Sequence, residues 1–386
     1  MKLLRSARFP AIMLLCAAAV GLILANSPLG PALADLRGTH LAAEGSAFDL
    51  SIGHWISDGL LAIFFFTAAI ELRYELTKGA LREPRKAMVP AIAAAGGVIV
   101  PVLVYLVFAN GTQYANGWPI PTATDIAFAL GVLAVFGRGL PGAVRAFLLA
   151  LAILDDIVGI FFIAVLFTND LQPLWLAAAG GLVLVFFVLS RMKPRTTTDA
   201  ALRQAALLII AIATWGMVYQ SGVHATIAGV ALGFAMAPRK ADRLRHRLEP
   251  WVNALVLPIF AFSSAAVMVP SVSMGELTPA FWGILVALPV GKIIGIALAG
   301  YLAQKALGTQ SDSHLPVGDL IAAGALGGIG FTVSLLLGEL AFAGDAEVRA
   351  EVTLAVLAGS IISMVLAGIF VSLRAHKYRK VAAVDS

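Results

Sequence analysis

Two adjacent aspartates, Asp155 and Asp156, lie near the middle of a strongly apolar run from Ala146 to Phe167 and are its only charged residues. A run of this length and composition is typical of a segment that spans a lipid bilayer. A carboxylate at the centre of a bilayer costs about 2.5–3.5 kcal/mol on insertion scales, whereas a folded protein is commonly stable by only about 5–15 kcal/mol. We therefore expect these two side chains to be retained for a function.

The composition excludes an ordinary soluble domain. Of the 386 residues, 60% are hydrophobic and only 13% are charged, which leaves room for about a dozen membrane helices of roughly 20 residues each. The net charge of +5 comes from basic residues in short loops between apolar segments. No basic patch with interleaved aromatic residues occurs, so we expect no nucleic-acid partner, and nothing in the sequence calls for a cofactor. The single cysteine, Cys16, rules out an internal disulfide.

The apolar segments predict an all-α integral membrane protein with about twelve spans, formed as one polytopic domain over residues 1–386. If the N-terminus is cytoplasmic, all 27 lysines and arginines fall on the cytoplasmic side except Arg37, Arg349 and Lys292. This asymmetry is the one expected of membrane proteins and also places the C-terminus in the cytoplasm. The predicted segments are 9–27, 54–72, 87–109, 122–137, 143–167, 173–190, 201–218, 221–237, 249–269, 280–304, 317–343 and 351–373.

The N-terminal segment has an alternative interpretation. Lys2, Arg5 and Arg8 precede an apolar run that ends near Ala32–Ala34, a pattern that resembles a cleaved signal peptide. The run is long for a signal peptide, and its removal would leave about eleven spans. The charge asymmetry is compatible with either outcome, and we favour a retained span.

Two of the predicted spans contain helix-breaking sequences. The fourth opens with WPIPTATD at Trp118–Asp125, and the eleventh contains four glycines within Gly324–Gly330. Each is the second span of a three-span block, spans 3–5 and spans 10–12. Interrupted helices at corresponding positions of two halves indicate inverted repeats in secondary transporters, with the binding site between the repeats.

The interruptions require charged partners inside the membrane, because broken helices leave backbone groups and partial charges of both signs unpaired. Asp125 can face the positive helix ends, and Lys292 can face the negative ends. Thr124 or Asp125 could instead cap the half-helix directly, in which case Asp125 balances charge and binds no substrate. Gly291 and Gly295 flank Lys292 at a spacing typical of close helix packing.

Asp155 and Asp156 point about 100° apart on a helix, so we expect one carboxylate in the ion path and the other turned toward the interruptions. Carboxylates that are buried beside each other hold protons more readily, and a group that binds either a proton or a hard cation is a minimal exchanger. Lys292 can pair with one aspartate, and breaking that pair would favour loss of the lysine proton too. The alternative is a structural ion pair, but one lysine does not neutralise three aspartates. The residues thus predict a cation and proton transporter.

Four motifs in the chain resemble the NhaA-type bacterial sodium/proton antiporters, and the similarity extends from about Leu14 to Arg374. The first two, PTATDIAFAL and LAILDD, are highly specific. The motifs are Pro121–Leu130 (PTATDIAFAL), Leu151–Asp156 (LAILDD), Ser221–Thr226 (SGVHAT) and Gly328–Thr332 (GIGFT).

The resemblance implies a secondary active transporter in a bacterial inner membrane that exports Na⁺ and Li⁺ in exchange for two protons per cation. It implies that Asp156 and Asp155 bind the Na⁺ ion and that Lys292 is the partner of Asp155. It also implies a homodimer, formed through a hairpin in the first outward loop near Gly45–Ile52. The broken-helix crossing would contain Asp125, Thr124, Gly328, Gly330 and Thr332.

The resemblance further implies activation at alkaline pH, sensed near the cytoplasmic mouth. Simpler alternatives are surface pairing for Glu71 and Glu75 and plain packing for His224. The residues at matching positions are Glu71, Glu75 and His246, with His224 tuning the response. The chain departs from the family at Arg245, where a sensor glutamate is usual, and at Glu249, Tyr74 and Phe262–Ala266.

Other functional classes fit the sequence less well. An intramembrane aspartyl protease needs two carboxylates that converge on one water, normally from different helices, and adjacent residues diverge. Its Gly-x-Gly-Asp sequence is also missing, because Phe331 follows Gly328–Gly330. A sodium-coupled symporter or an inactive sensor on the same fold remains an alternative. We therefore expect a transporter and not an enzyme.

Overall fold

The computed structural model describes residues 8–41, 49–168, 170–269, 275–307 and 314–384, and these fold almost entirely into helices. No β-strand forms within these ranges, where extended backbone pairs only at an isolated bridge between His40 and Ser51. Eight helices are long and apolar enough to cross a membrane, or up to eleven if each of three bent pairs is one span. The all-helical prediction is confirmed. The count of about twelve is not confirmed, because segment 221–237 contains only the ten-residue helix α10 (Thr226–Ala235).

Several spans are regular helices, whereas three others contain a short π-helical segment. Pro289 lies inside one π segment and Pro258 just after another, where the wider turn relieves the clash of a proline ring with the preceding turn. The third π segment, η2, contains no proline. The regular helices are α5 (Pro84–Ala109), α7 (Gly142–Leu166), α8 (Pro173–Arg191), α9 (Thr197–Gln220) and α17 (Ala346–Val384), with the short η3 (Ala80–Arg82) before α5. The π-containing spans are α3–η2–α4 (Ile52–His54, Trp55–Leu60, Leu61–Thr77), α11–η6–α12 (Pro238–Trp251, Val252–Val256, Leu257–Ala265) and α13–η7–α14 (Pro279–Val286, Ala287–Gly291, Lys292–Leu307).

Three helix pairs are sharply bent, and two of the bends fall at the predicted interruptions. The helix pair before and after residues 123–125 is bent by 41°, and the pair before and after residues 328–330 by 50°. The third bend, of 109°, separates α1 from α2 and follows from the prolines Pro28 and Pro31. The bent pairs are α1 (Arg8–Ala25) with α2 (Gly30–Gly38), η4 and η5 (Ala115–Gly117, Ile120–Thr122) with α6 (Ile126–Phe136), and α15 (Val317–Gly327) with α16 (Phe331–Ala341).

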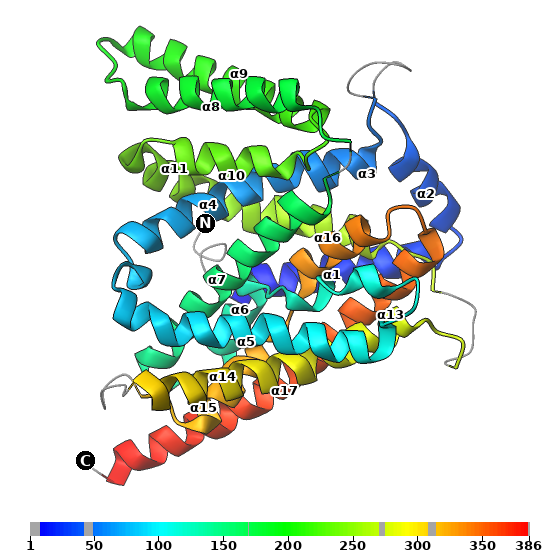
Figure 1. Cartoon of the computed structure of the whole chain (residues 1–386), viewed down its shortest axis with the longest axis vertical. Coiled ribbons are helices and arrows are strands. Elements are labelled where there is room, and N and C mark those ends of the chain that lie inside the picture. The colour runs from blue at the N-terminus through cyan, green and yellow to red at the C-terminus, as the bar shows by residue number, and fades with distance from the viewer. Residues whose placement is uncertain (1–7, 42–48, 169, 270–274, 308–313, 385–386) are drawn as a thin grey trace.

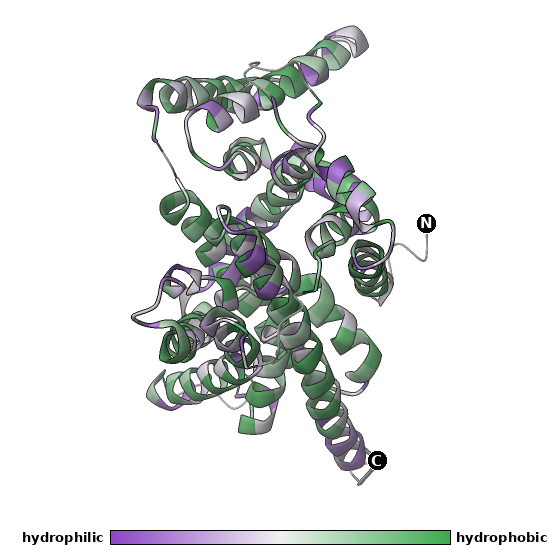
Figure 2. Ribbon diagram, turned by 90° about the vertical axis from the view of Figure 1, so that its right-hand side faces the viewer, coloured by the Kyte–Doolittle hydropathy of each residue, from purple (hydrophilic) through white to green (hydrophobic). Residues whose placement is uncertain are grey.

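The helices run mainly across the page in Figure 1, so the bundle has two ends. We call the end at the right, with α2 and α3, the α2 face, and the end at the left, with α11 and the C-terminus, the C-terminal face. The α8–α9 hairpin lies at the top, α4 and α10 lie below it, and α5, α14, α15 and α17 lie at the bottom. Figure 2 shows helices that are hydrophobic along most of their length, with a hydrophilic C-terminal end of α17.

Glycines let the central helices approach backbone to backbone. A Cβ atom on Gly295 of α14 would lie 2.2 Å from the carbonyl oxygen of Gly96 on α5, and a Cβ on Gly229 of α10 would lie 2.1 Å from the carbonyl oxygen of Ala62 on α4. Such contacts are the usual way for membrane helices to pack, because lipid gives no hydrophobic drive for their association. Large apolar side chains such as Val107 and Leu174 are 82% and 80% exposed, as expected of a surface that faces lipid.

We expect Gly295→Ala to destabilise the protein by about 1–3 kcal/mol, the usual effect of overpacking a core. The added methyl group meets backbone, which cannot rotate away. Thermal unfolding of the purified protein in detergent measures this effect. Gly180→Ala is the matched control, because a Cβ at this exposed position in α8 meets no atom within 4 Å. An equal melting temperature for the two variants would show that α5 and α14 pack less tightly than described.

Candidate functional site

The two interrupted spans meet at their breaks. The amide of Asp125 donates a hydrogen bond of 2.6 Å to the carbonyl of Ile329, and the hydroxyl of Thr124 lies 2.8 Å from the carbonyl oxygen of Gly327. Carbonyls at the end of a helix have no partner within the helix itself. Here the extended residues before α6 supply partners for carbonyls at the end of α15, so each break compensates the other.

Asp125 caps both half-helices that start at this crossing. Its Oδ1 accepts a hydrogen bond of 3.2 Å from the amide of Phe128 in α6. Its Oδ2 accepts from the amide of Thr332 at 3.2 Å and from the Thr332 hydroxyl at 2.7 Å, at the start of α16. A carboxylate is favourable at a helix N-terminus because of the partial positive charge there. Asp125 therefore has the geometry of a helix cap, as in the alternative in which it balances charge and binds no substrate. Its side chain is also close to the cavity described below.

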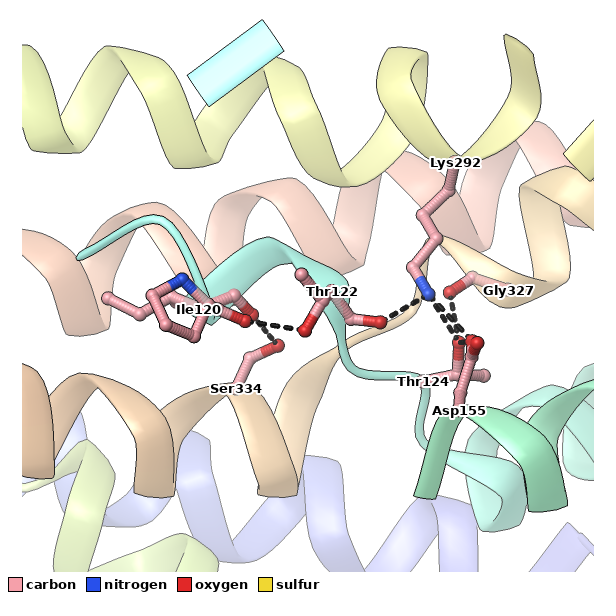
Figure 3. Close-up of polar contacts among 8 residues, drawn as sticks. Ile120, Thr122, Thr124, Asp155, Lys292, Gly327 and Ser334 are labelled. Carbon is pink, nitrogen blue, oxygen red and sulfur yellow. Dashed lines mark hydrogen bonds and ion pairs between the residues drawn. The ribbon is translucent and has the colours of Figure 1, made fainter. Parts of the chain in front are cut away.

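Lys292, the first residue of α14, is completely buried and points into the same crossing (Figure 3). Its ammonium lies 2.7 Å from Oδ2 of Asp155 and 3.1 Å from the hydroxyl of Thr124, and it also donates to the carbonyl of Thr122. Three acceptors match the three protons of a charged ammonium. The carbonyl of Thr122 could not be anticipated from side-chain patterns, because it is a backbone group exposed by the break.

Thr124 connects the ion pair to the broken helices. Its hydroxyl lies 2.6 Å from Oδ2 of Asp155 and 2.8 Å from the carbonyl oxygen of Gly327 (Figure 3). A hydroxyl has one proton, so it donates to only one of these acceptors at a time. The other oxygen of Asp155, Oδ1, is buried and has no hydrogen-bond partner among the described residues.

Asp156 is not part of the ion pair and lines a cavity of about 170 Å³. Asp125 and Thr332 line the same cavity, which therefore reaches the crossing of the broken helices. Asp155 is not part of the lining, as expected from the divergence of adjacent residues on α7. Asn253, in the π segment η6, also lines the cavity and was missed by the sequence reasoning, since one amide in an apolar segment carries little signal.

An ion pair borders this cavity between α4 and α11, toward the C-terminal face. Nη1 of Arg245 lies 3.1 Å from Oε1 of Glu71, and Glu249 of α11 lines the cavity as well. The guanidinium also lies 6.0 Å from the ring centre of Tyr74. The lining of the cavity thus includes one basic and two acidic side chains besides Asp125 and Asp156.

The remaining predicted pH-response residues lie elsewhere. Neither Glu75 nor His246 lines the cavity, and His246 is an exposed residue 3.8 Å from Glu249. His224 is outside the lining too, and its Nδ1 is 3.2 Å from Oδ1 of Asp58. The crossing thus brings together Asp125, Thr124, Lys292, Asp155, Gly328, Gly330 and Thr332, with Asp156 beside it and Glu71 and Arg245 at the mouth.

The chain is similar to known proteins over nearly its whole length. The profile of the family described as Na⁺/H⁺ antiporter 1 matches residues 1–371. The chain is 53% identical over 385 residues to "Na(+)/H(+) antiporter NhaA 2" of Clavibacter michiganensis subsp. michiganensis, which covers 99% of this chain and 94% of that protein. It is 46% identical over 383 residues to "Na(+)/H(+) antiporter NhaA" of Tropheryma whipplei, covering 98% and 97%, respectively. The corresponding protein of Streptomyces avermitilis is 41% identical over 388 residues, covering 97% and 82%.

We expect Lys292→Met to destabilise the protein by about 3–5 kcal/mol, because it leaves the Asp155 carboxylate buried without its counter-ion. Adding Asp155→Asn should restore most of that loss, since no uncompensated charge then remains. Thermal unfolding of both variants in detergent tests this expectation. A double variant that is less stable than Lys292→Met alone would mean that the carboxylate is not the source of the destabilisation.

Proposed function

The chain belongs to the Na⁺/H⁺ antiporter 1 family and is a transporter rather than an enzyme, and from this premise we propose how it works. It exports Na⁺ and Li⁺ in exchange for two protons per cation, so that each cycle moves net charge. Its activity rises at alkaline pH and serves sodium and pH homeostasis. The supporting observation is a carboxylate, Asp156, that lines a cavity beside a second carboxylate held by a lysine.

The geometry supports a specific proton balance. A cation in the cavity binds Asp156 and displaces the proton held there. The unpartnered Oδ1 of Asp155 provides the second oxygen ligand once that side chain turns from Lys292 toward the cation. An ammonium without its counter-ion is disfavoured in a site removed from water, so Lys292 releases the second proton. Two protons leave for each cation that binds, and the reverse occurs on the other side of the membrane.

Thr124 and Asp125 hold this site together in our proposal. The Thr124 hydroxyl keeps contact with Gly327 of α15 when Asp155 moves away, and Asp125 keeps both half-helices capped. Gly328 and Gly330 leave room for close approach at the crossing, since a Cβ on Gly328 would lie 2.6 Å from the carbonyl oxygen of Leu288. These residues therefore position the ion-binding carboxylates and do not themselves exchange protons.

We propose that the C-terminal face is cytoplasmic, that both termini lie there, and that the membrane is a bacterial inner membrane. The distribution of the 27 lysines and arginines supports this orientation. The short helix α10, together with the preceding Ser221–Ala225, then serves as span 8 in chain order and completes the count of twelve. Spans 3–5 and 10–12 form the inverted repeats. The two interruptions that contact each other support the repeat assignment.

A homodimer in the lipid bilayer is part of the proposal and rests on family resemblance. Of the stretch Gly45–Ile52, expected to form the dimer hairpin, residues 45–48 lie outside the described ranges. The bridge between His40 and Ser51 and the contact of 2.6 Å between His40 and Asp49 bring the flanks of this loop together.

Exchange in proteoliposomes tests the proposed function. A pH gradient across sealed vesicles should collapse when NaCl or LiCl is added without any organic solute, and KCl should have no effect. A symporter would need its solute to respond. If wild-type protein collapses the gradient at no pH with either salt, the proposed function is wrong.

We expect Asp156→Asn to abolish sodium-dependent proton release, because an amide neither ionises nor offers a charged ligand. Asp35→Asn is the matched control, since Asp35 is an exposed carboxylate on α2. Fluorescence of a pH indicator in the same vesicles reports the rate. Exchange by Asp156→Asn at the wild-type rate would remove Asp156 from the ion site.

Arg245→Glu should move the pH profile of exchange by about one unit toward alkaline pH. The change replaces an ion pair with a third carboxylate near Glu71 and Glu249, and like charges in proximity favour the protonated forms. Initial rates between pH 6 and 9 at saturating NaCl give the profile. Arg247→Glu makes the same charge change at an exposed position on α11 that does not line the cavity, and its profile should match wild type. Superimposable profiles for both variants would exclude Arg245 from pH regulation.

A further inference from the structure

A second group of polar side chains lies at the α2 face, around the buried carboxylate Asp58. This residue is only 6% exposed, and its Oδ1 is 3.2 Å from Nδ1 of His224. Neither of these two atoms completes a hydrogen bond with the described residues. The hydroxyl of Thr226, which is fully buried, also has no partner there. Buried polar atoms are nearly always paired in native proteins. Among the described residues, Oδ1 of Asp58 and Nδ1 of His224 meet each other without completing a hydrogen bond, and the Thr226 hydroxyl has no partner, which indicates a site that takes up a partner.

Helix packing fixes Thr226 at the level of Asp58. A Cβ on Gly229 would touch the carbonyl oxygen of Ala62, and one on Gly233 would lie 2.6 Å from the carbonyl oxygen of Phe66. The step from Gly229 to Gly233 on α10 matches the step from Ala62 to Phe66 on α4, four residues in each helix. The two helices therefore run parallel over this stretch. This packing brings the start of α10 toward η2. His224, two residues before Thr226, contacts Asp58 and sets Thr226 near that carboxylate.

The local backbone is unusual and is held in place by aromatic side chains. Asp58 lies in η2, the π segment that contains no proline to explain it. Such segments are frequent at functional sites. The indole of Trp215 donates a hydrogen bond of 3.0 Å to the carbonyl of Asp58 and stacks on Trp55, with ring centres 5.1 Å apart. These contacts hold the backbone that carries the Asp58 carboxylate in place.

The surrounding charges leave Asp58 available to a cation. No lysine or arginine forms an ion pair with it among the described residues. Glu339 of α16 is close enough to interact electrostatically with both Asp58 and His224, and it also interacts with Arg37 and Arg349. His54 and Tyr219 are the other titratable groups that interact with Asp58. Arg37 and Arg349 interact with Glu339, and neither forms an ion pair with Asp58 among the described residues, so no fixed cation occupies the place beside that carboxylate.

Asp58 also lies on the helix that lines the cavity of Asp156. Phe64, Thr67 and Glu71 of α4 line that cavity, with Glu71 at its mouth. Asp58 lies 13 residues before Glu71, or about 20 Å along the helix, at the opposite end of the span from the mouth. One helix thus carries acidic side chains at both ends of the path on which a cation would travel.

We propose that the Asp58 carboxylate and the Thr226 hydroxyl form a second binding station for the transported monovalent cation, at the α2 face, and that the arriving cation displaces His224 from Asp58. Oxygen ligands, one of them charged, suit a hard cation such as Na⁺. The station receives the ion after Asp156 and holds it before release. This inference rests on the proposed sodium export and adds the exit side of the path.

Exchange measured from each side of the membrane tests the station. Inverted and right-side-out vesicles present Na⁺ to the C-terminal face and the α2 face, respectively. Asp58→Asn should raise the apparent KM for Na⁺ at the α2 face about tenfold or more, the effect of losing a charged ligand. The apparent KM at the C-terminal face should change by less than about twofold. A side chain with only a structural role would lower the maximal rate from both sides and leave the ratio of the two KM values unchanged.

Thr226 provides a second, milder variant if Asp58→Asn fails to fold. Thr226→Val keeps the shape and removes the hydroxyl, so it should raise KM at the α2 face alone, and Thr226→Ser should retain the wild-type value. Asp35→Asn, an exposed carboxylate on α2, is the control for general surface charge. If wild-type vesicles exchange sodium but Thr226→Val and Asp58→Asn both keep the wild-type ratio of the two KM values, the station is overturned. The proposed function then still stands. Absence of exchange in wild type would instead overturn the proposed function.

Discussion

The structure depends on one constraint: backbone groups freed by two interrupted helices must find partners away from water. In a bilayer such groups cannot be left to solvent. The segments satisfy each other through the contacts of Thr124 with Gly327 and of Asp125 with Ile329, and Asp125 and Lys292 supply the charges that the helix ends require. The polar centre of the protein is thus a product of the break itself, and the proposed ion chemistry would use groups that the fold must provide in any case.

The two central aspartates have different surroundings although they are neighbours in the chain. Asp155 is buried with Lys292 and Thr124, whereas Asp156 borders the cavity. The rotation of about 100° between adjacent helical residues separates them. A carboxylate held by a fixed counter-ion and another accessible from a cavity can respond to the same cation in two ways, and this difference is the physical basis of the proposed exchange of two protons.

Sequence reasoning predicted the helical class, both interruptions and the divergence of Asp155 from Asp156, because apolar length, proline and glycine content and helical rotation are local properties. It did not predict the π segments, the bend of 109° between α1 and α2, or the Thr122 carbonyl as a ligand of Lys292. Asp58 was also missed, since its significance comes from His224 and Thr226, which are far away in the chain. Such features arise from packing between helices, and a single sequence carries no direct record of it. The count of about twelve spans and the assigned roles of the site residues remain predictions.

The backbone contact between Gly96 and Gly295 has a consequence for motion. Interfaces formed by long side chains can slide as those side chains change rotamer, but two backbones in contact have no such freedom. Lys292 begins α14, three residues before Gly295, so it is mechanically coupled to α5. Any movement that opens the opposite side of the membrane must then carry α5 and α14 as one rigid body, and the lysine travels with them.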